Sequence, residues 1–290
     1  PWTPPVGFQS IPALKSISDN LANFPSKNDK GQVQHQTPLA IYNAMVHPIL
    51  KYRFKGALWY QGESDANKEA AKIYTQNMKN LVQATRDDMG IEQLPWLVVQ
   101  IGCHAAPDGK YWNSVQEQQR LLPKVIEKLD VAPTVDLSID DGIHISGVGQ
   151  QMLGKRLARL ASRLVFKDPK EKSGIYLKGV SCAVKSPKPG DPKTIVVELE
   201  YGNVKGKLQS QGLPTGFTMI DAKGKAFPSL YKITLRGNRV LLETGQTMDL
   251  LKTLAVSYGH DRHPYCNITD ADGMSLPAMQ RVPIQGSHAS

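Results

Sequence analysis

The sequence predicts an α/β fold in the first part of the chain and a β-rich region after it. Up to about Phe166, short apolar runs alternate with amphipathic ones, whereas from Gly174 on the chain carries short β-rich runs broken by turn residues. A length of 290 residues suffices for one large domain or two ordinary ones. We therefore expect an α/β domain over 1–168 and a second, β-rich domain over 174–284.

The first part is expected to contain a parallel sheet. The run 96–101 (WLVVQI) is apolar, as in a parallel strand that is covered on both faces. Strands that alternate with helices imply right-handed crossovers between parallel strands. The expected strands are 56–60, 96–101 and 134–137. The expected helices are 67–85, capped by Asn67, 114–129, interrupted at Pro123, and 148–165, capped by Ser146. The buried side of the last helix is expected to carry Met152, Leu153, Leu157, Leu160 and Leu164.

The second part begins after the segment 167–170 (KDPK). Several strands at close spacing, separated by turn residues, favour a β-sandwich-like domain. The final segment 286–290 resembles a linker, and we expect no role for it. The expected strands are 194–199, 216–220, 231–235, 240–243 and 253–258, with turns at 221–224 and 236–238.

Composition narrows the classes of function. Lys and Arg number 35 against 26 Asp and Glu, a formal charge of +9 that would suit nucleic acid or an acidic polysaccharide. The basic residues are scattered, however, with modest clusters at 167–172 and 185–193. None of these clusters is interleaved with aromatic residues, so we expect no nucleic-acid partner.

Neither a membrane span nor a signal peptide is visible in the sequence. No apolar run approaches the length that a transmembrane helix needs. The opening PWTPP lacks the basic start and apolar middle of a signal peptide, and it has no initiating Met. We therefore expect a cleaved or upstream segment ahead of Pro1.

The three cysteines are Cys103, Cys182 and Cys266. They lack the CxxC or Cys/His spacing of a structural zinc site, so we expect no metal. Cys182 and Cys266 could pair in a secreted protein, which would leave Cys103 over. Buried free thiols are an equal alternative.

An acid and a histidine three residues apart, Asp141 and His144, precede the last expected helix of the first part. At this spacing the carboxylate can bind the imidazole Nδ1 and hold one tautomer, which leaves Nε2 to take a proton from a nucleophile. We predict Asp141 and His144 as a catalytic acid–base pair. Alone, such a pair is a weak signal, because a surface turn would use the same residues.

The segment 61–64 (QGES) follows the first expected strand, at the end where ligands bind in open α/β sheets. The Gln61 amide could donate to an oxyanion, and Gly62 permits close approach of the backbone. Glu63 could be a supporting acid or an alternative partner for the histidine. Ser64 lacks the second glycine of a nucleophile elbow, so we expect it to be structural.

Six segments together are more specific than these two motifs. In order along the chain they are 41–48 (IYNAMVHP), 55–64 (KGALWYQGES), 94–100 (LPWLVVQ), 141–144 (DGIH), 264–268 (PYCNI) and 273–278 (GMSLPA). They closely resemble the sialate O-acetylesterase family, a branch of the SGNH hydrolases that is related to the acetylxylan esterases. The resemblance covers nearly the whole chain.

The resemblance implies an SGNH fold, which is a flavodoxin-like three-layer α/β/α sandwich, with an appended β domain. It implies metal-free and cofactor-free removal of O-acetyl groups from sugars by a Ser-His-Asp arrangement, and it makes a secreted or periplasmic location plausible. His144 would be the general base, Asp141 its orienting acid, and Gln61 with Gly62 part of the oxyanion hole. Further residues that could line a sugar pocket, although packing is the simpler expectation for each, are Asn43, Trp112, Gln118 and Arg120.

The chain departs from the family's pattern at the nucleophile. The family's serine lies in an N-terminal Gly-Gln-Ser-Asn type block, and the similar segment 7–10 (GFQS) has no Asn after it and no apolar strand before it, so Ser10 is not assigned. We expect a second polypeptide segment to supply the serine, the first strand and one oxyanion donor. The expected substrate is an acetylated glycan of the sialic acid or xylan type. A fragment, a noncatalytic carbohydrate-binding remnant and a hydrolase of longer acyl chains are the alternatives.

Overall fold

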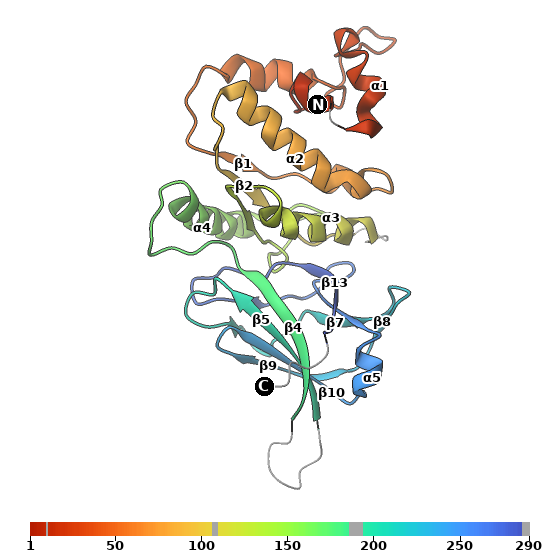
Figure 1. Ribbon diagram of the computed structural model, residues 1–290, viewed down its shortest axis with the longest axis vertical. Helices are drawn as coiled ribbons and strands as arrows, with labels where there is room; N and C mark the ends of the chain where they lie inside the picture. Colours follow the sequence, from red (N-terminus) through yellow and green to blue (C-terminus); the bar gives the residue numbers. More distant parts are fainter. Residues whose placement is uncertain (10, 106–109, 186–193, 286–290) are drawn as a thin grey trace.

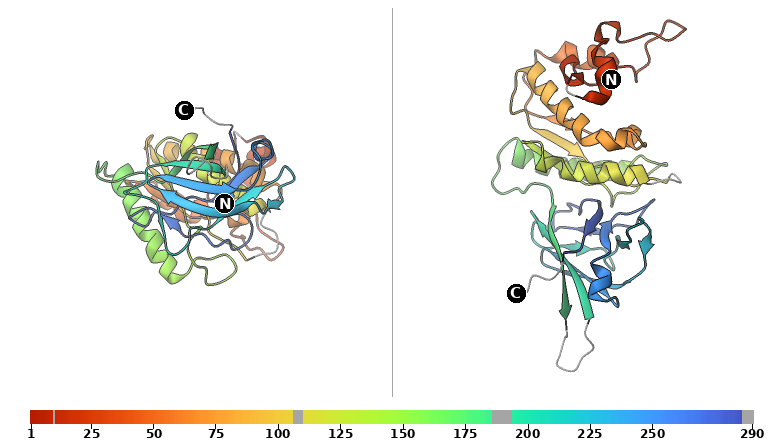
Figure 2. Two further views of the ribbon diagram at one scale, coloured as in Figure 1. Left: turned by 90° about the horizontal axis from the view of Figure 1, so that it is seen from below. Right: turned by 45° about the vertical axis from the view of Figure 1, so that its right-hand side comes forward.

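The computed structural model describes residues 1–9, 11–105, 110–185 and 194–285. Along the longest axis, the N-terminal segments and helix α2 lie at one end, the parallel sheet with helices α3 and α4 lies in the middle, and the β-rich region lies at the other end (Figure 1). A view turned by 45° shows the same succession (Figure 2). The prediction of a mixed α/β chain, with the β-rich part last, is therefore confirmed.

In the described part of the chain, the first region contains one parallel sheet of three strands, in the order β1-β2-β3. Alternate side chains of the central strand face opposite ways: Trp96 and Val98 share a buried cluster with helices α2 and α3, whereas Leu97 and Val99 share one with helix α4. Helices thus cover both faces. The bounds are β1 Ala57–Trp59, β2 Trp96–Val99, β3 Leu129–Ala132, α2 Ala70–Met89, α3 Lys110–Leu121 and α4 Gly147–Leu164.

The third strand lies earlier in the sequence than predicted. Residues 134–137 form a turn instead of a strand, because Pro133 directly follows β3 and has no N–H to donate to the ladder. Strand β3 was not predicted because it contains Asp130, and a carboxylate rarely lies inside a buried strand. It is tolerated because it accepts hydrogen bonds from backbone N–H groups, including that of Gly174 at 3.0 Å.

Helix α4 begins where predicted. The Ser146 hydroxyl caps it by accepting from the N–H of Gly149 at 3.0 Å. Leu153 and Leu160 are buried as expected, but the prediction for Met152 was wrong, because this side chain is 40% exposed. Successive residues of a helix point about 100° apart, so Met152 lies at the flank of the face that Leu153 and Leu160 bury.

The β-rich region consists, in its described residues, of two four-stranded antiparallel sheets and a two-stranded pair. The sheet orders are β4-β5-β10-β9 and β13-β11-β7-β8, with β12-β6 as the pair. The five predicted strands are present as β5, β7, β9, β10 and β11, whereas β4 and β13 were not predicted. The bounds are β4 Tyr176–Lys185, β5 Thr194–Gly202, β6 Gln209–Ser210, β7 Phe217–Ile220, β8 Ala226–Phe227, β9 Leu230–Arg236, β10 Arg239–Thr244, β11 Ala255–Tyr258, β12 Ile268–Thr269 and β13 Met279–Pro283.

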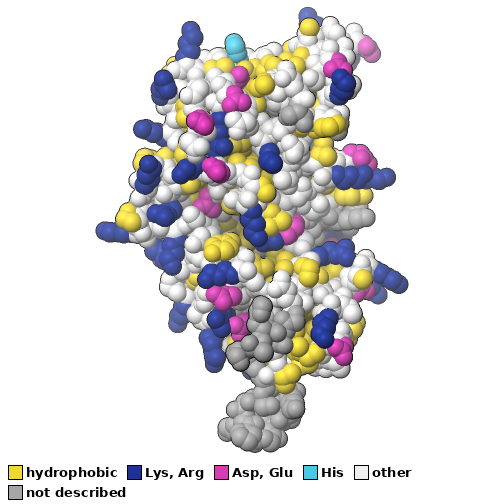
Figure 3. All heavy atoms as spheres, viewed as in Figure 1, with side chains coloured by type: hydrophobic (Ala, Val, Ile, Leu, Met, Phe, Trp, Pro, Cys, Tyr) yellow, Lys and Arg dark blue, Asp and Glu magenta, His cyan; other side chains and the backbone are white. Residues whose placement is uncertain are grey.

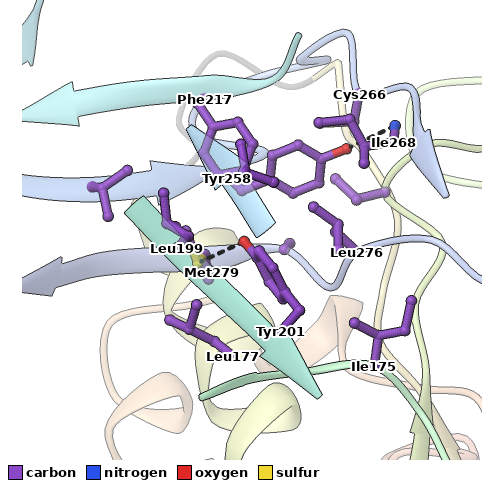
Figure 4. Packing of buried hydrophobic residues seen from close by; sticks show 14 of the residues in the cluster. Ile175, Leu177, Leu199, Tyr201, Phe217, Tyr258, Cys266, Ile268, Leu276 and Met279 are labelled. Atoms are coloured by element: carbon purple, nitrogen blue, oxygen red, sulfur yellow. Dashed lines mark hydrogen bonds between the residues drawn. The ribbon is translucent and has the colours of Figure 1, made fainter. Parts of the chain in front are cut away.

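One hydrophobic cluster runs through both regions. It joins Leu97 of the parallel sheet to residues of the β-rich region such as Tyr201 and Met279. Figure 4 shows the Tyr201 hydroxyl directed at the Met279 sulfur, and the ring of Tyr258 against that of Phe217 with centroids 4.7 Å apart. The β-rich region therefore shares a core with the sheet that carries the predicted site.

Among the described residues before β1, short helical turns surround a small cluster of Phe8, Leu39 and Tyr42. On the face shown in Figure 3, Lys and Arg are spread over the molecule and not gathered in one patch. Within the described ranges, no helix is long and apolar enough to cross a membrane. The remaining elements are α1 Lys15–Ser18, α5 Met248–Leu251, a π-helical turn Tyr42–Val46, and 3-10 turns at Pro5–Phe8, Pro12–Leu14, Leu21–Asn23, His47–Ile49, Glu63–Asp65 and Leu122–Lys124.

Candidate functional site

The loop between β3 and α4 brings Asp141 and His144 into contact. Asp141 Oδ2 lies 2.6 Å from His144 Nδ1. Asp141 Oδ1 accepts from the backbone N–H groups of Ile143 at 2.8 Å and of His144 at 2.7 Å. One carboxylate thus closes the turn and orients the imidazole. Among the described residues, none hydrogen-bonds to His144 Nε2.

These contacts shift the titration of both groups. The hydrogen bonds from the His144 ring and from two backbone N–H groups lower the pKa of Asp141 to about 2. The hydrogen bond and the charge of Asp141 raise the pKa of His144, and the Glu63 carboxylate adds to this effect. Both side chains of the pair are exposed. The arrangement suits an imidazole that takes up a proton at Nε2, as a general base does.

A second loop, at the carboxyl end of β1, carries Gln61, Gly62 and Glu63. The Gln61 side-chain amide donates to Asp65 at 2.6 Å, and the Gly62 N–H donates to the Glu63 carboxylate at 2.9 Å. The Gly62 N–H is therefore already engaged, and it has to exchange this partner before it can donate to an oxyanion. The oxyanion role of this loop stays a prediction.

Behind this loop lies Gln119, which the sequence analysis missed. Its fully buried side chain accepts from the Ile101 N–H at 2.9 Å and donates to the Gln61 carbonyl at 3.0 Å and the Tyr74 hydroxyl at 2.9 Å. A Cβ at position 62 would lie 2.8 Å from Gln119 Nε2. Gln119 thus ties the end of β1 to the end of β2 and leaves room for glycine alone at position 62.

The two loops lie at the same edge of the sheet, because both follow the carboxyl ends of parallel strands. The Glu63 carboxylate is close enough to raise the pKa of His144. Of the two acids that could partner the histidine, however, it is Asp141 that hydrogen-bonds to the ring.

The other predicted pocket residues have different surroundings. Trp112 is buried and donates to the Gly102 carbonyl at 2.8 Å. Gln118 hydrogen-bonds to helix α2, and Arg120 forms an ion pair within its own helix. Asn43 is exposed in the π-helical turn. Trp112, Gln118 and Arg120 therefore have packing or internal hydrogen-bonding roles.

The cysteines hold no disulfide. Cys103, Cys182 and Cys266 are all buried free thiols, so the structure has the second of the two alternatives and no pairing of Cys182 with Cys266. Burial raises the pKa of Cys103 to about 12, which removes it as a thiolate nucleophile near neutral pH. Over the described ranges, no group of three His, Cys, Asp or Glu side chains is placed to hold a metal ion.

No serine of the described segments hydrogen-bonds to His144. Ser64 is exposed in the 3-10 turn that follows Gly62. Ser10 lies outside the described residues. The candidate site therefore contains a hydrogen-bonded Asp–His pair and a polar loop at the same edge of the sheet, without an assigned nucleophile.

Residues 30–163 match the protein family described as "Carbohydrate esterase, sialic acid-specific acetylesterase". This range includes both loops of the candidate site. Among curated proteins, a probable carbohydrate esterase from Arabidopsis thaliana is 34% identical over 110 residues, which cover 36% of this chain and 39% of that protein.

Two solved structures are similar to parts of the chain. A carbohydrate acetylesterase from Xanthomonas citri superposes with a TM-score of 0.68 and 22% identity over 87% of this chain and 55% of the other, which is a likeness of fold. A protein from Arabidopsis thaliana matches at 32% identity and a TM-score of 0.33 over 37% of this chain and 43% of the other. This chain thus spans between 39% and 55% of the length of these relatives.

Proposed function

Because residues 30–163 match the family of sialic acid-specific acetylesterases among the carbohydrate esterases, we propose that this chain removes O-acetyl groups from acetylated sugars. The observation that carries the proposal is the contact between Asp141 and His144 at the carboxyl edge of the parallel sheet, beside the loop of Gln61 to Glu63. The family description favours sialic acid as the sugar, and xylan-type glycans are the second substrate class.

In the proposed mechanism, a serine from a segment outside this chain attacks the acetyl carbonyl carbon. His144 Nε2 takes the serine proton, while Asp141 holds Nδ1–H and stabilises the imidazolium. His144 then protonates the departing sugar oxygen, which leaves an acetyl-serine. Water attacks this ester with His144 again as the base, His144 returns that proton to the serine oxygen as the ester bond breaks, and the acid leaves as acetate with release of a proton. Gln61 and the Gly62 N–H donate to the oxyanion once they release their carboxylate partners.

The unpaired edge of the parallel sheet supports the proposal that another segment supplies the serine on an additional strand. In the described part of the chain, β1 is an end strand that pairs with β2 alone. Leu58 in its centre is 67% exposed, which is costly for a long apolar side chain on a strand. A strand paired with β1 would end beside the Gln61 loop and extend the sheet toward the SGNH arrangement. From the family resemblance we also propose a secreted or periplasmic location and a mechanism without metal or cofactor.

The test is acetate release by the protein purified from its natural source, with O-acetylated sialic acid and acetylated xylan as substrates. His144→Ala should reduce turnover by at least about a hundredfold, because general-base catalysis is lost. Folding should change little, since His144 is exposed. His35→Ala, another exposed histidine, is the matched control. Full activity of His144→Ala would contradict the assignment of His144 as the general base.

The position of the serine is tested by intact mass and by labelling with a serine-reactive fluorophosphonate. We expect a second polypeptide with a Gly-Gln-Ser-Asn type block to copurify and to carry the label, and we expect no label in the His144→Ala protein. Label on a serine of this chain contradicts the external nucleophile. A single 290-residue species that binds glycan without releasing acetate indicates a noncatalytic binding protein.

A further inference from the structure

A loop of the β-rich region reaches the edge of the parallel sheet that carries the candidate site. This segment, residues 259–266 between β11 and β12, is here named the 259–266 loop. A Cβ on Gly259 would come within 2.6 Å of the Val135 side chain. Further along, the Cys103 sulfur approaches the Pro264 carbonyl at 3.9 Å. The loop is therefore packed against the segments that follow strands β2 and β3.

A single peptide group connects this loop to the loop of Asp141 and His144. The carbonyl of His104 accepts from the N–H of His263 at 2.9 Å, and the N–H of Ala105 donates to the carbonyl of Gly142 at 2.7 Å. This carbonyl and this N–H belong to the same planar peptide unit. The His263 nitrogen and the Gly142 oxygen therefore lie at most about 8 Å apart.

The backbone of the 259–266 loop is held in an uncommon conformation. Asp261 and His263 have φ values of 68° and 38°, in the left-handed region that non-glycine residues disfavour. The Asp261 N–H is fixed by Asn113 Oδ1 at 3.0 Å, and the His263 N–H by the His104 carbonyl. Such strain persists where the surroundings over-determine it, which is common at ligand sites.

Two side chains of the 259–266 loop are exposed and have no hydrogen-bonding or ionic partner among the described residues. Tyr265 is 70% exposed, and Arg262 forms no ion pair or hydrogen bond within the described residues. An aromatic ring offers an apolar face to the C–H groups of a pyranose. A guanidinium group presents paired N–H donors that match a carboxylate. Together these groups suit an acidic sugar.

We propose that Tyr265 and Arg262 bind the sugar whose acetyl ester lies beside His144, and that Arg262 selects sugars that carry a carboxylate. The inference rests on the proposed esterase function for the identity of the substrate. The parallel sheet then supplies the acid–base pair, and the β-rich region supplies the specificity.

The test is an NMR titration of the whole protein with two probes. The first is the methyl α-glycoside of N-acetylneuraminic acid, which carries a carboxylate, and the second is its methyl ester, which does not. Arg262→Ala should weaken binding of the acid by about tenfold or more and leave binding of the ester unchanged, because a charge-assisted pair is lost. Tyr265→Ala should weaken binding of both probes by about three- to tenfold.

Matched controls come from strand β9, where Tyr231 and Arg236 are exposed; β9 belongs to the other four-stranded sheet of the β-rich region. Tyr231→Ala and Arg236→Ala should bind both probes as the unmodified protein does. Three results overturn the proposal: no binding of the acid by the unmodified protein, unchanged binding in both loop variants, or equal losses for acid and ester in Arg262→Ala.

The outcome is separable from the esterase proposal because the titration needs neither a serine nor turnover. A protein that binds the acid through Arg262 but never releases acetate refutes the esterase and keeps the binding site. A protein that releases acetate but binds the acid equally well after Arg262→Ala refutes the binding site and keeps the esterase.

Discussion

Asp141 makes three hydrogen bonds with one carboxylate, and the properties of His144 depend on them. The raised pKa of His144 means that the folded protein binds its proton more tightly than the unfolded chain does. This contribution to stability is full below about pH 6.5 and is lost as pH rises through the folded-state pKa. For Asp141 the contribution is present above about pH 3.9 and is lost as pH falls toward 2.

The first prediction concerns this pair. Asp141→Asn should lower the pKa of His144, because an amide lacks the negative charge that stabilises the imidazolium. The measurement is an NMR titration of the His144 ring C–H signals. Asp140→Asn, which changes a neighbouring exposed acid, should leave the midpoint nearly unchanged. An identical midpoint in Asp141→Asn and the unmodified protein would contradict the observed contact.

The second prediction concerns Gly62. A Cβ there would lie 2.8 Å from Gln119 Nε2 and 3.0 Å from Ile101 Cγ2, and both neighbours are buried. Gly62→Ala should therefore lower the free energy of unfolding by about 1–3 kcal/mol, as measured by urea denaturation. At Gly142 a Cβ meets nothing within 4 Å, so Gly142→Ala should stay within about 0.5 kcal/mol. Similar free energies of unfolding for Gly62→Ala and Gly142→Ala would show that the Gln119 side chain moves aside at little cost.

At the scale of elements, helix α4 joins the parallel sheet to the β-rich region through two buried arginines. Arg159 Nη1 lies 2.7 Å from the fully buried carboxylate of Asp270. Arg156 pairs with Asp136 and donates to the Gly273 carbonyl at 2.9 Å. The helix that starts directly after the hydrogen-bonded pair of Asp141 and His144 is thus anchored on the 270–273 turn.

The third prediction follows from this anchor. Arg159→Met leaves the Asp270 carboxylate buried without its cation, which should lower the free energy of unfolding by about 3 kcal/mol. Arg163→Met, at an exposed position in the last turn of the same helix, should change it by less than about 0.5 kcal/mol. Adding Asp270→Asn to Arg159→Met should restore part of the lost free energy of unfolding. Equal stability of the two single variants would mean that Asp270 is held by its backbone donors alone.

At the scale of the whole molecule, the hydrophobic cluster continues from the parallel sheet into the β-rich region. Buried polar side chains cross the same boundary. Gln100 in the first region donates to the Ala278 carbonyl and accepts from the Ala278 N–H, each at 2.9 Å. Loss of either region would therefore expose apolar surface and leave buried hydrogen-bonding groups without partners.

The fourth prediction concerns a truncated chain. Residues 1–168 alone should lack a cooperative thermal unfolding transition and should bind a hydrophobic dye, because the shared cluster is cut. The whole chain, measured by circular dichroism under the same conditions, is the reference. A truncated chain that unfolds cooperatively at the same temperature would show that the predicted domain boundary near residue 168 separates independent units.

Features with local causes could be predicted from the amino-acid sequence. Helix α4 could be predicted with its cap at Ser146, because a hydroxyl reaches an N–H three residues away within one turn. The contact between Asp141 and His144 could be predicted for the same reason. Each depends on a few consecutive residues and on backbone geometry that varies little between proteins.

Features that depend on partners distant in the sequence became visible only in the folded chain. The position of β3 depends on Gly174, whose N–H makes the burial of Asp130 tolerable. The role of Gln119 depends on the Gln61 carbonyl, 58 positions away. The link between the 259–266 loop and the loop of Asp141 and His144 depends on the peptide group between His104 and Ala105. Periodicity shows which residues are buried, but the folded chain decides which distant group satisfies each buried polar atom.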